Sequence, residues 1–94
     1  MIVRVVRMTF REGSENDFLL VFETNKDKIR SFDGCSHLDL LRDIHNPNIF
    51  TTYSHWDNEE CLNAYRDSVL FLEVWAKTKQ LFSDSPEAHS YTVQ

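Results

Sequence analysis

The chain has 94 residues, a formal net charge of −5 and a pI near 5.2, and 41% of its residues are hydrophobic. This apolar content is typical of a folded chain, and the length predicts a single domain over residues 1–94. An acidic chain without a basic cluster predicts neither nucleic acid nor an anionic membrane as partner. No apolar run reaches the roughly 18 residues of a membrane-spanning helix, and arginines interrupt the apolar N-terminus, unlike in a signal peptide.

Two cysteines, Cys35 and Cys61, bear on the cellular compartment. They lack the C-x-x-C spacing of redox and metal motifs. We interpret them as buried free thiols, which are typical of a reducing compartment, and we predict a cytoplasmic location.

The first third of the chain predicts a strand followed by a helix. Residues Ile2–Phe10 are rich in β-branched and apolar types on both faces, which indicates a strand covered on both sides. Apolar residues then recur at helical spacing over about Glu15–Arg30. Ser14 is a suitable N-cap for this helix, with Asp17 at the capping-box position, and Gly34 follows its end.

A β-hairpin is predicted next, from an alternating strand over Cys35–His45, a turn at residues 46–48 and a strand over Ile49–Trp56 that is rich in Thr, Tyr and Phe. The remainder predicts two helices and a last strand. Asp57, with Glu60 at the capping-box position, is the expected N-cap of a short helix over residues 58–66. A second helix is expected from about Val69 to Phe82, and a strand over residues 88–93.

The predicted order is β-α-β-β-α-β, an α+β chain with the ferredoxin-like arrangement. Helices should cover one face of a four-stranded antiparallel sheet. The other face carries too many apolar groups to remain in water, so we expect a homodimer in which two sheets pack face to face.

Two motifs carry a family resemblance: the strand end Tyr53-Ser54-His55-Trp56 and the helical Ala64-Tyr65-Arg66-Asp67-Ser68-x-x-Phe71. With the order of elements, they resemble the antibiotic biosynthesis monooxygenase (ABM) superfamily of dimeric α+β barrels over essentially the whole chain. Some members oxygenate polycyclic aromatic substrates with O₂ and neither metal nor flavin, others bind and degrade haem, and many have no established activity. The resemblance implies a cofactor-independent monooxygenase for a small aromatic or quinol-like substrate. The alternative is a non-catalytic homodimeric module that binds a small apolar ligand or a partner.

The haem-degrading branch of that family can be compared residue by residue. Trp56 matches its tryptophan, but Val6 stands where that branch has an asparagine, and Trp75 stands where it has an axial histidine. An indole donates only an N–H and cannot ligate iron. We therefore expect no haem degradation and no cofactor.

Candidate catalytic residues are few. His37 and Asp39 lie two apart on one predicted strand, so they share a face and form either a proton-transfer pair or a surface pair. His55 should point to the opposite face from Trp56. No H-x-H or H-x-x-x-H spacing occurs, so no metal site is expected.

Aromatic side chains are the candidate substrate-binding residues: Trp56, Tyr65, Phe71 and Trp75. They either form core or line a pocket for a flat apolar ligand between the sheet and the last helices.

The arginines of the first strand need partners if they are buried. Asp39 and Asp43 are the expected partners of Arg4 or Arg7. We also expect Arg66 to pair with Asp67 at the break between the two helices.

Overall fold

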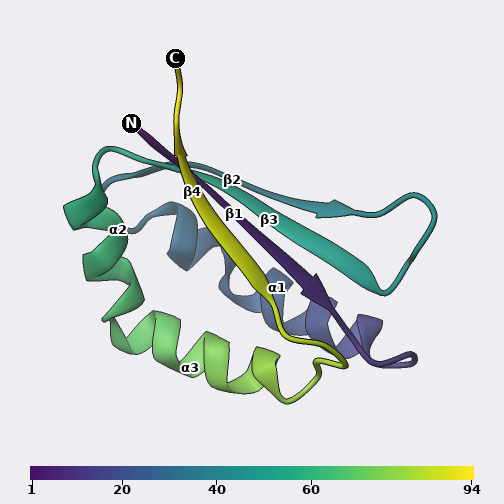
Figure 1. The fold of residues 1–94 in the computed structure, drawn as a ribbon. Helices are drawn as coiled ribbons and strands as arrows, with labels where there is room; N and C mark the ends of the chain where they lie inside the picture. Colours follow the sequence, from purple (N-terminus) through teal and green to yellow (C-terminus); the bar gives the residue numbers. More distant parts are fainter.

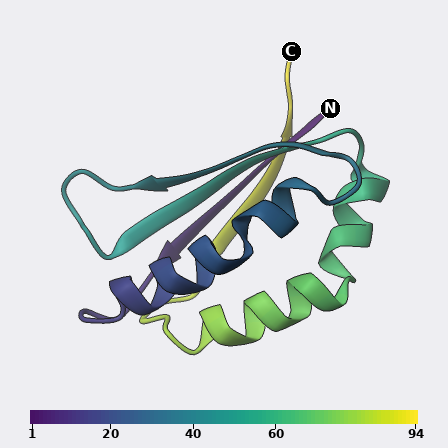
Figure 2. The ribbon, with the colours of Figure 1, turned by 180° about the vertical axis from the view of Figure 1, so that it is seen from behind.

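One antiparallel sheet of four strands has all three helices on one of its faces (Figures 1 and 2). The structure is a computed structural model that describes residues 1–94. The strand order is β2-β3-β1-β4. The elements are β1 (Ile2–Thr9), α1 (Glu15–Arg30), β2 (Cys35–Arg42), β3 (Ile49–Trp56), α2 (Glu59–Arg66), α3 (Val69–Lys79) and β4 (Glu87–Thr92). The predicted α+β, ferredoxin-like fold is confirmed.

The predicted hairpin forms, and β3 has the predicted bounds. The strand β2 ends at Arg42, earlier than the predicted His45. The Asp43 carboxylate explains the early end, because it accepts backbone N–H bonds from His45 and Asn46, each at 2.8 Å. These bonds lower the pKa of Asp43 and turn the chain before it returns as β3.

One of the two predicted helix caps is confirmed. Ser14 is the N-cap of α1, as predicted, although its side chain makes no capping hydrogen bond. Asn58, not Asp57, is the N-cap of α2, and its side chain accepts from the Cys61 N–H at 2.9 Å. The N–H of Asp57 instead donates to the Gly34 carbonyl at 2.8 Å, so the helix begins one residue later than predicted.

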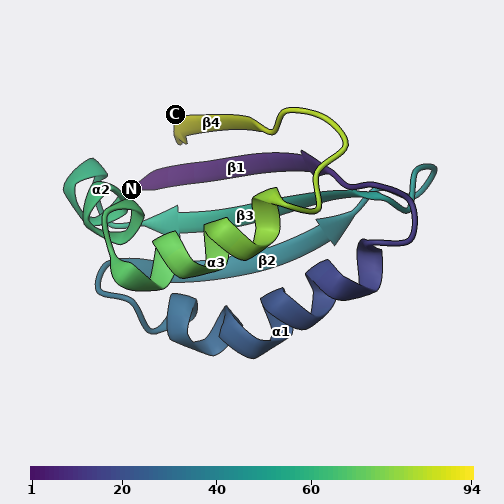
Figure 3. The ribbon, with the colours of Figure 1, turned by 90° about the horizontal axis from the view of Figure 1, so that it is seen from below.

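The last helix is shorter than predicted, and the last strand is shifted by one residue from the predicted 88–93. At the start of α3, the Ser68 hydroxyl accepts from the Phe71 N–H at 3.1 Å, and the helix ends at Lys79, before the predicted Phe82. The strand β4 is an edge strand that pairs only with β1, beside which it lies in Figure 3. No helix is both long and apolar enough to cross a membrane.

The core lies between the sheet and the helices and is shallow, since only 12 of 94 residues are buried. Its largest cluster consists of Met8, Phe10, Phe18, Phe22, Ile29, Leu38 and Phe50. Phe10 is at its centre, with its ring centroid 4.3 Å from that of Phe18. A domain of this size buries a modest share of its surface, so a partner that covers the free sheet face would add stability.

Candidate functional site

A cavity of about 290 Å³ lies between the sheet and the three helices. Of its 20 lining residues, 14 are hydrophobic, so it suits an apolar ligand. The floor comes from residues of β1 and β3 that alternate toward the helices, among them Val6, Met8, Thr52 and Trp56. Side chains of α1, α2 and α3 form the walls.

The four predicted substrate-binding aromatics all line this cavity. Trp56 stacks on Tyr65 with ring centroids 4.8 Å apart, Tyr65 meets the edge of Phe71 at 5.2 Å, and Phe71 stacks on Trp75 at 5.8 Å. The spacing of four residues between Phe71 and Trp75 places both rings on one side of α3. The aromatics therefore form one continuous wall, and their role toward a ligand stays a proposal.

The two tryptophans differ in burial. Trp56 is 1% exposed, and its indole N–H donates to the Ser54 hydroxyl at 3.0 Å. Trp75 is only partly buried. Burial, followed by the nearby Cys35 thiol, raises the pKa of Tyr65, so its phenol stays protonated at neutral pH and can donate a hydrogen bond.

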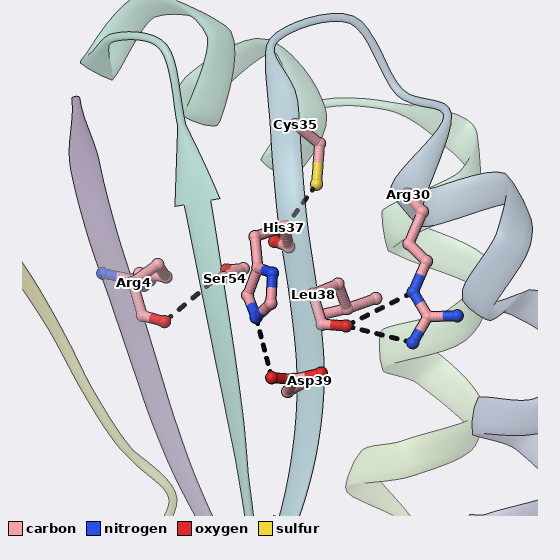
Figure 4. Close-up of polar contacts among 7 residues, drawn as sticks. All are labelled: Arg4, Arg30, Cys35, His37, Leu38, Asp39 and Ser54. Atoms are coloured by element: carbon pink, nitrogen blue, oxygen red, sulfur yellow. Dashed lines mark hydrogen bonds and ion pairs between the residues drawn. The ribbon is translucent and has the colours of Figure 1, made fainter.

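Polar groups in the cavity include two arginines, Arg4 from β1 and Arg66 from α2. Arg4 Nη1 donates to the Ser90 hydroxyl of β4 at 3.0 Å, and its carbonyl accepts from Ser54 at 3.5 Å (Figure 4). Neither arginine forms an ion pair within the chain. No histidine, aspartate or glutamate lines the cavity.

The predicted arginine partners were wrong. Arg7 lies 3.8 Å from Glu87 on the neighbouring strand, not beside Asp39 or Asp43. Asp43 instead caps the hairpin turn. Arg66 and Asp67 make no ion pair, because Asp67 is the C-cap of α2 while Arg66 lines the cavity.

The candidate catalytic pair is on the other side of the sheet. His37 Nε2 and Asp39 Oδ2 are 2.7 Å apart on β2 (Figure 4), and both side chains are about half exposed. Neither lines the cavity, whereas Leu38 between them does. The pair is therefore too remote to act as the base for a ligand held in the cavity. His55 also points away from the cavity, opposite to Trp56 as predicted.

Both cysteines are free and only partly buried, which corrects the prediction of buried thiols. Burial nevertheless raises the pKa of the Cys35 thiol. Gly34, with a φ of 86°, leaves the room that the Cys61 side chain fills, because a Cβ there would lie 2.5 Å from the Cβ of Cys61. The cytoplasmic location stays a prediction.

Residues 1–77, most of the chain, match the family described as antibiotic biosynthesis monooxygenase. The chain belongs to this family. The resemblance found in the sequence is thus confirmed. A comparison with curated protein sequences gave no match.

Solved structures share the ABM fold over the full length of the chain. A conserved protein from Methanosarcina mazei Go1 has a TM-score of 0.93 and 19% identity, covering 100% of this chain and 94% of that one. Rv0793 from Mycobacterium tuberculosis has a TM-score of 0.91 and 15% identity, with 99% and 94% covered. A mutant of SnoaB, a cofactor-independent oxygenase from Streptomyces nogalater, has a TM-score of 0.88 and 19% identity, with 99% and 92% covered. At such low sequence identities, the structural similarity to these proteins shows a shared fold.

Sequence reasoning missed the two arginines as members of the site. Arg4 shares its strand face with Val6 and Met8, and that alternation was a usable signal that it faces the helices. Arg66 had no comparable signal, because only the packing of α2 against β3 brings it to the same cavity.

Proposed function

We propose that this ABM chain is a cofactor-independent monooxygenase for a small aromatic or quinol-like substrate held between the sheet and the helices. The observation that carries the proposal is the cavity of about 290 Å³ with its aromatic wall. Its volume is near the lower end, about 300 Å³, of small-molecule sites. The name of one structural relative, a cofactor-independent oxygenase, supports the same chemistry.

The chemistry needs an electron-rich substrate carbon and a dry pocket. In such a reaction a ring CH₂ and O₂ give a ring carbonyl and water, so one oxygen atom enters the product and the other leaves as water. The deprotonated substrate supplies the electrons to O₂. The protein contributes position and exclusion of water, and the Tyr65 hydroxyl, in the cavity lining, can donate a hydrogen bond to a substrate oxygen.

Oxygen consumption tests the proposal and separates it from the non-catalytic alternative. With anthrone as probe, the protein should produce anthraquinone and consume one O₂ per product, at a rate well above that in buffer. An oxygen electrode and product chromatography measure the two quantities. Binding of anthrone with oxygen uptake no faster than in buffer would leave the non-catalytic ligand-binding module as the function.

A homodimer formed by the free sheet face is the second part of the proposal. Tyr91 and Leu41 on this face are 53% and 50% exposed, although both carry large apolar surfaces. His55 Nε2 is buried there without a hydrogen-bond partner in the chain. Leaving a buried polar atom unpaired costs about 1–3 kcal/mol, and a symmetric partner sheet can supply both apolar cover and a partner atom.

Haem is not expected to be degraded. The cavity presents the side chains of Val6 and Trp75, and no histidine, to a planar ligand. Haem added with ascorbate should therefore keep its absorbance, apart from the slow bleaching seen without protein. Formation of a Soret band typical of histidine ligation, followed by its protein-dependent loss, would contradict this prediction.

A further inference from the structure

The most unusual feature of the cavity is its positive charge. Arg4 and Arg66 come from β1 and α2, 62 positions apart in the sequence, yet both line the same apolar space. The only hydrogen bond of the Arg4 guanidinium is to the neutral hydroxyl of Ser90. The guanidinium of Arg66 makes none within the chain, so donors of both groups remain free for a ligand.

Nothing acidic balances this charge. The cavity lining contains no carboxylate, and the ion pairs of the chain involve other residues. Burial and the charge of Arg66 both lower the pKa of Arg4, which shows that the two cations disfavour each other. Arg4 is only partly buried and Arg66 is exposed, and an anion bound at both guanidinium groups would relieve the repulsion between them.

The cavity also lacks a general base. Its lining has no histidine or carboxylate, and the His37–Asp39 pair lies on the other face of the sheet. A substrate that must react as an anion therefore has to lose its proton to water before or during entry, and the site has to favour the ionised form.

We propose that the cavity binds its aromatic ligand as an anion, with an ionised ring oxygen held by the guanidinium groups of Arg4 and Arg66. The ligand class is an acidic polycyclic phenol or hydroxyquinone, because its rings suit the Trp56–Trp75 wall and its oxygen suits the arginine fork. The inference rests on the proposed function for the reaction that follows binding, but binding itself can be measured separately.

A matched pair of probes tests the charge preference. 2-Hydroxy-1,4-naphthoquinone is ionised at neutral pH, whereas 2-methoxy-1,4-naphthoquinone has the same rings and no acidic proton. Isothermal titration calorimetry at pH 7 should give roughly tenfold to hundredfold tighter binding of the hydroxy compound, the range for a hydrogen bond to a charged group. Equal affinities for the two probes would overturn the proposal.

Variants of the two arginines test whether these residues cause the preference for the ionised probe. Arg4→Gln and Arg66→Gln should each reduce the affinity for the hydroxy probe about tenfold and leave that for the methoxy probe unchanged. Lys28→Gln removes one exposed positive charge from α1, outside the cavity, and should change neither affinity. If Arg4→Gln fails to fold, the test relies on Arg66→Gln, because Arg66 is exposed at the end of α2 and its replacement should not disturb the fold. Undiminished preference in the folded variants would overturn the proposal.

The two proposals fail in distinguishable ways. Arginine-dependent binding of the hydroxy probe, with oxygen consumption on anthrone no faster than in buffer, would remove the oxygenase function and keep the anion site. Oxygen consumption on anthrone with equal binding of the two naphthoquinones would keep the function and remove the anion site.

Discussion

Replacing Trp56 with alanine is expected to lower the free energy of unfolding by about 3–5 kcal/mol, the cost typical of deleting a buried aromatic side chain. The indole is 1% exposed, stacks on Tyr65 and meets the edge of Phe32 with centroids 6.3 Å apart. A small domain has about 5–15 kcal/mol in total, so the variant should unfold at far lower urea concentration. Urea titration followed by far-UV circular dichroism measures the difference.

A conservative replacement separates packing from hydrogen bonding at this position. Trp56→Phe keeps a ring but removes the N–H that donates to the Ser54 hydroxyl, and it should cost less than the alanine change. A Trp56→Ala protein within about 1 kcal/mol of the parent would contradict the assignment of this side chain to the core.

Trp75 should respond differently because it is partly exposed at the cavity wall. Trp75→Ala is expected to cost only roughly 1–2 kcal/mol of stability, in proportion to the smaller area removed from contact. It should weaken binding of 1,4-naphthoquinone about fivefold to tenfold, because one stacking surface is lost. Quenching of the remaining Trp56 fluorescence measures the affinity.

The control for Trp75 is Leu72→Ala, on the same helix, where the side chain is 56% exposed and outside the cavity. It should leave quinone binding unchanged. A Trp75→Ala protein that loses about 3–5 kcal/mol of stability but keeps its affinity for quinones would assign the indole to structure alone.

Much of the fold was predictable because local signals agreed with tertiary packing. The β-branched and apolar content of Ile2–Phe10 and the Thr- and Tyr-rich run at Ile49–Trp56 predicted β1 and β3, and these strands pair over their full length. The caps were harder to predict. Asp57 and Asn58 are equally good caps by residue type, and a long-range hydrogen bond from Asp57 to Gly34 decides between them.

The candidate site was predictable only where its members share an element. The spacing of Phe71 and Trp75 on α3 predicted that their rings lie together, and they do. The same alternation that pairs His37 with Asp39 places Leu38 on the opposite face, and apolar residues mark the covered face. The same signal places His37 and Asp39 on the face of the sheet away from the cavity.

Loss of the dimer is the other large effect expected, from Val5→Glu. Val5 lies on the free face of the central strand β1, opposite Tyr53 on one side and His89 on the other. A carboxylate there would lie inside the proposed interface, with Tyr53 and His89 as its ladder neighbours, and taking a charge out of water costs several kcal/mol. Light scattering at micromolar concentration should give twice the 11.1 kDa chain mass for the parent and the single mass for the variant.

Leu20→Glu is the matched control for this prediction. Leu20 is 69% exposed on α1, so the same charge is added on the helical side of the molecule, away from the free sheet face. This variant should remain dimeric, which separates the effect of position from that of net charge.

The effect of Val5→Glu on dimerisation should be large because a two-fold axis through the centre of the free face would bring the two copies of residue 5 close together. Two like charges would then oppose each other in a dry interface, and the dissociation constant should rise by at least a hundredfold, about 2.7 kcal/mol. A parent protein with the mass of one chain, or a Val5→Glu protein that stays dimeric, would show that the free face is not the interface.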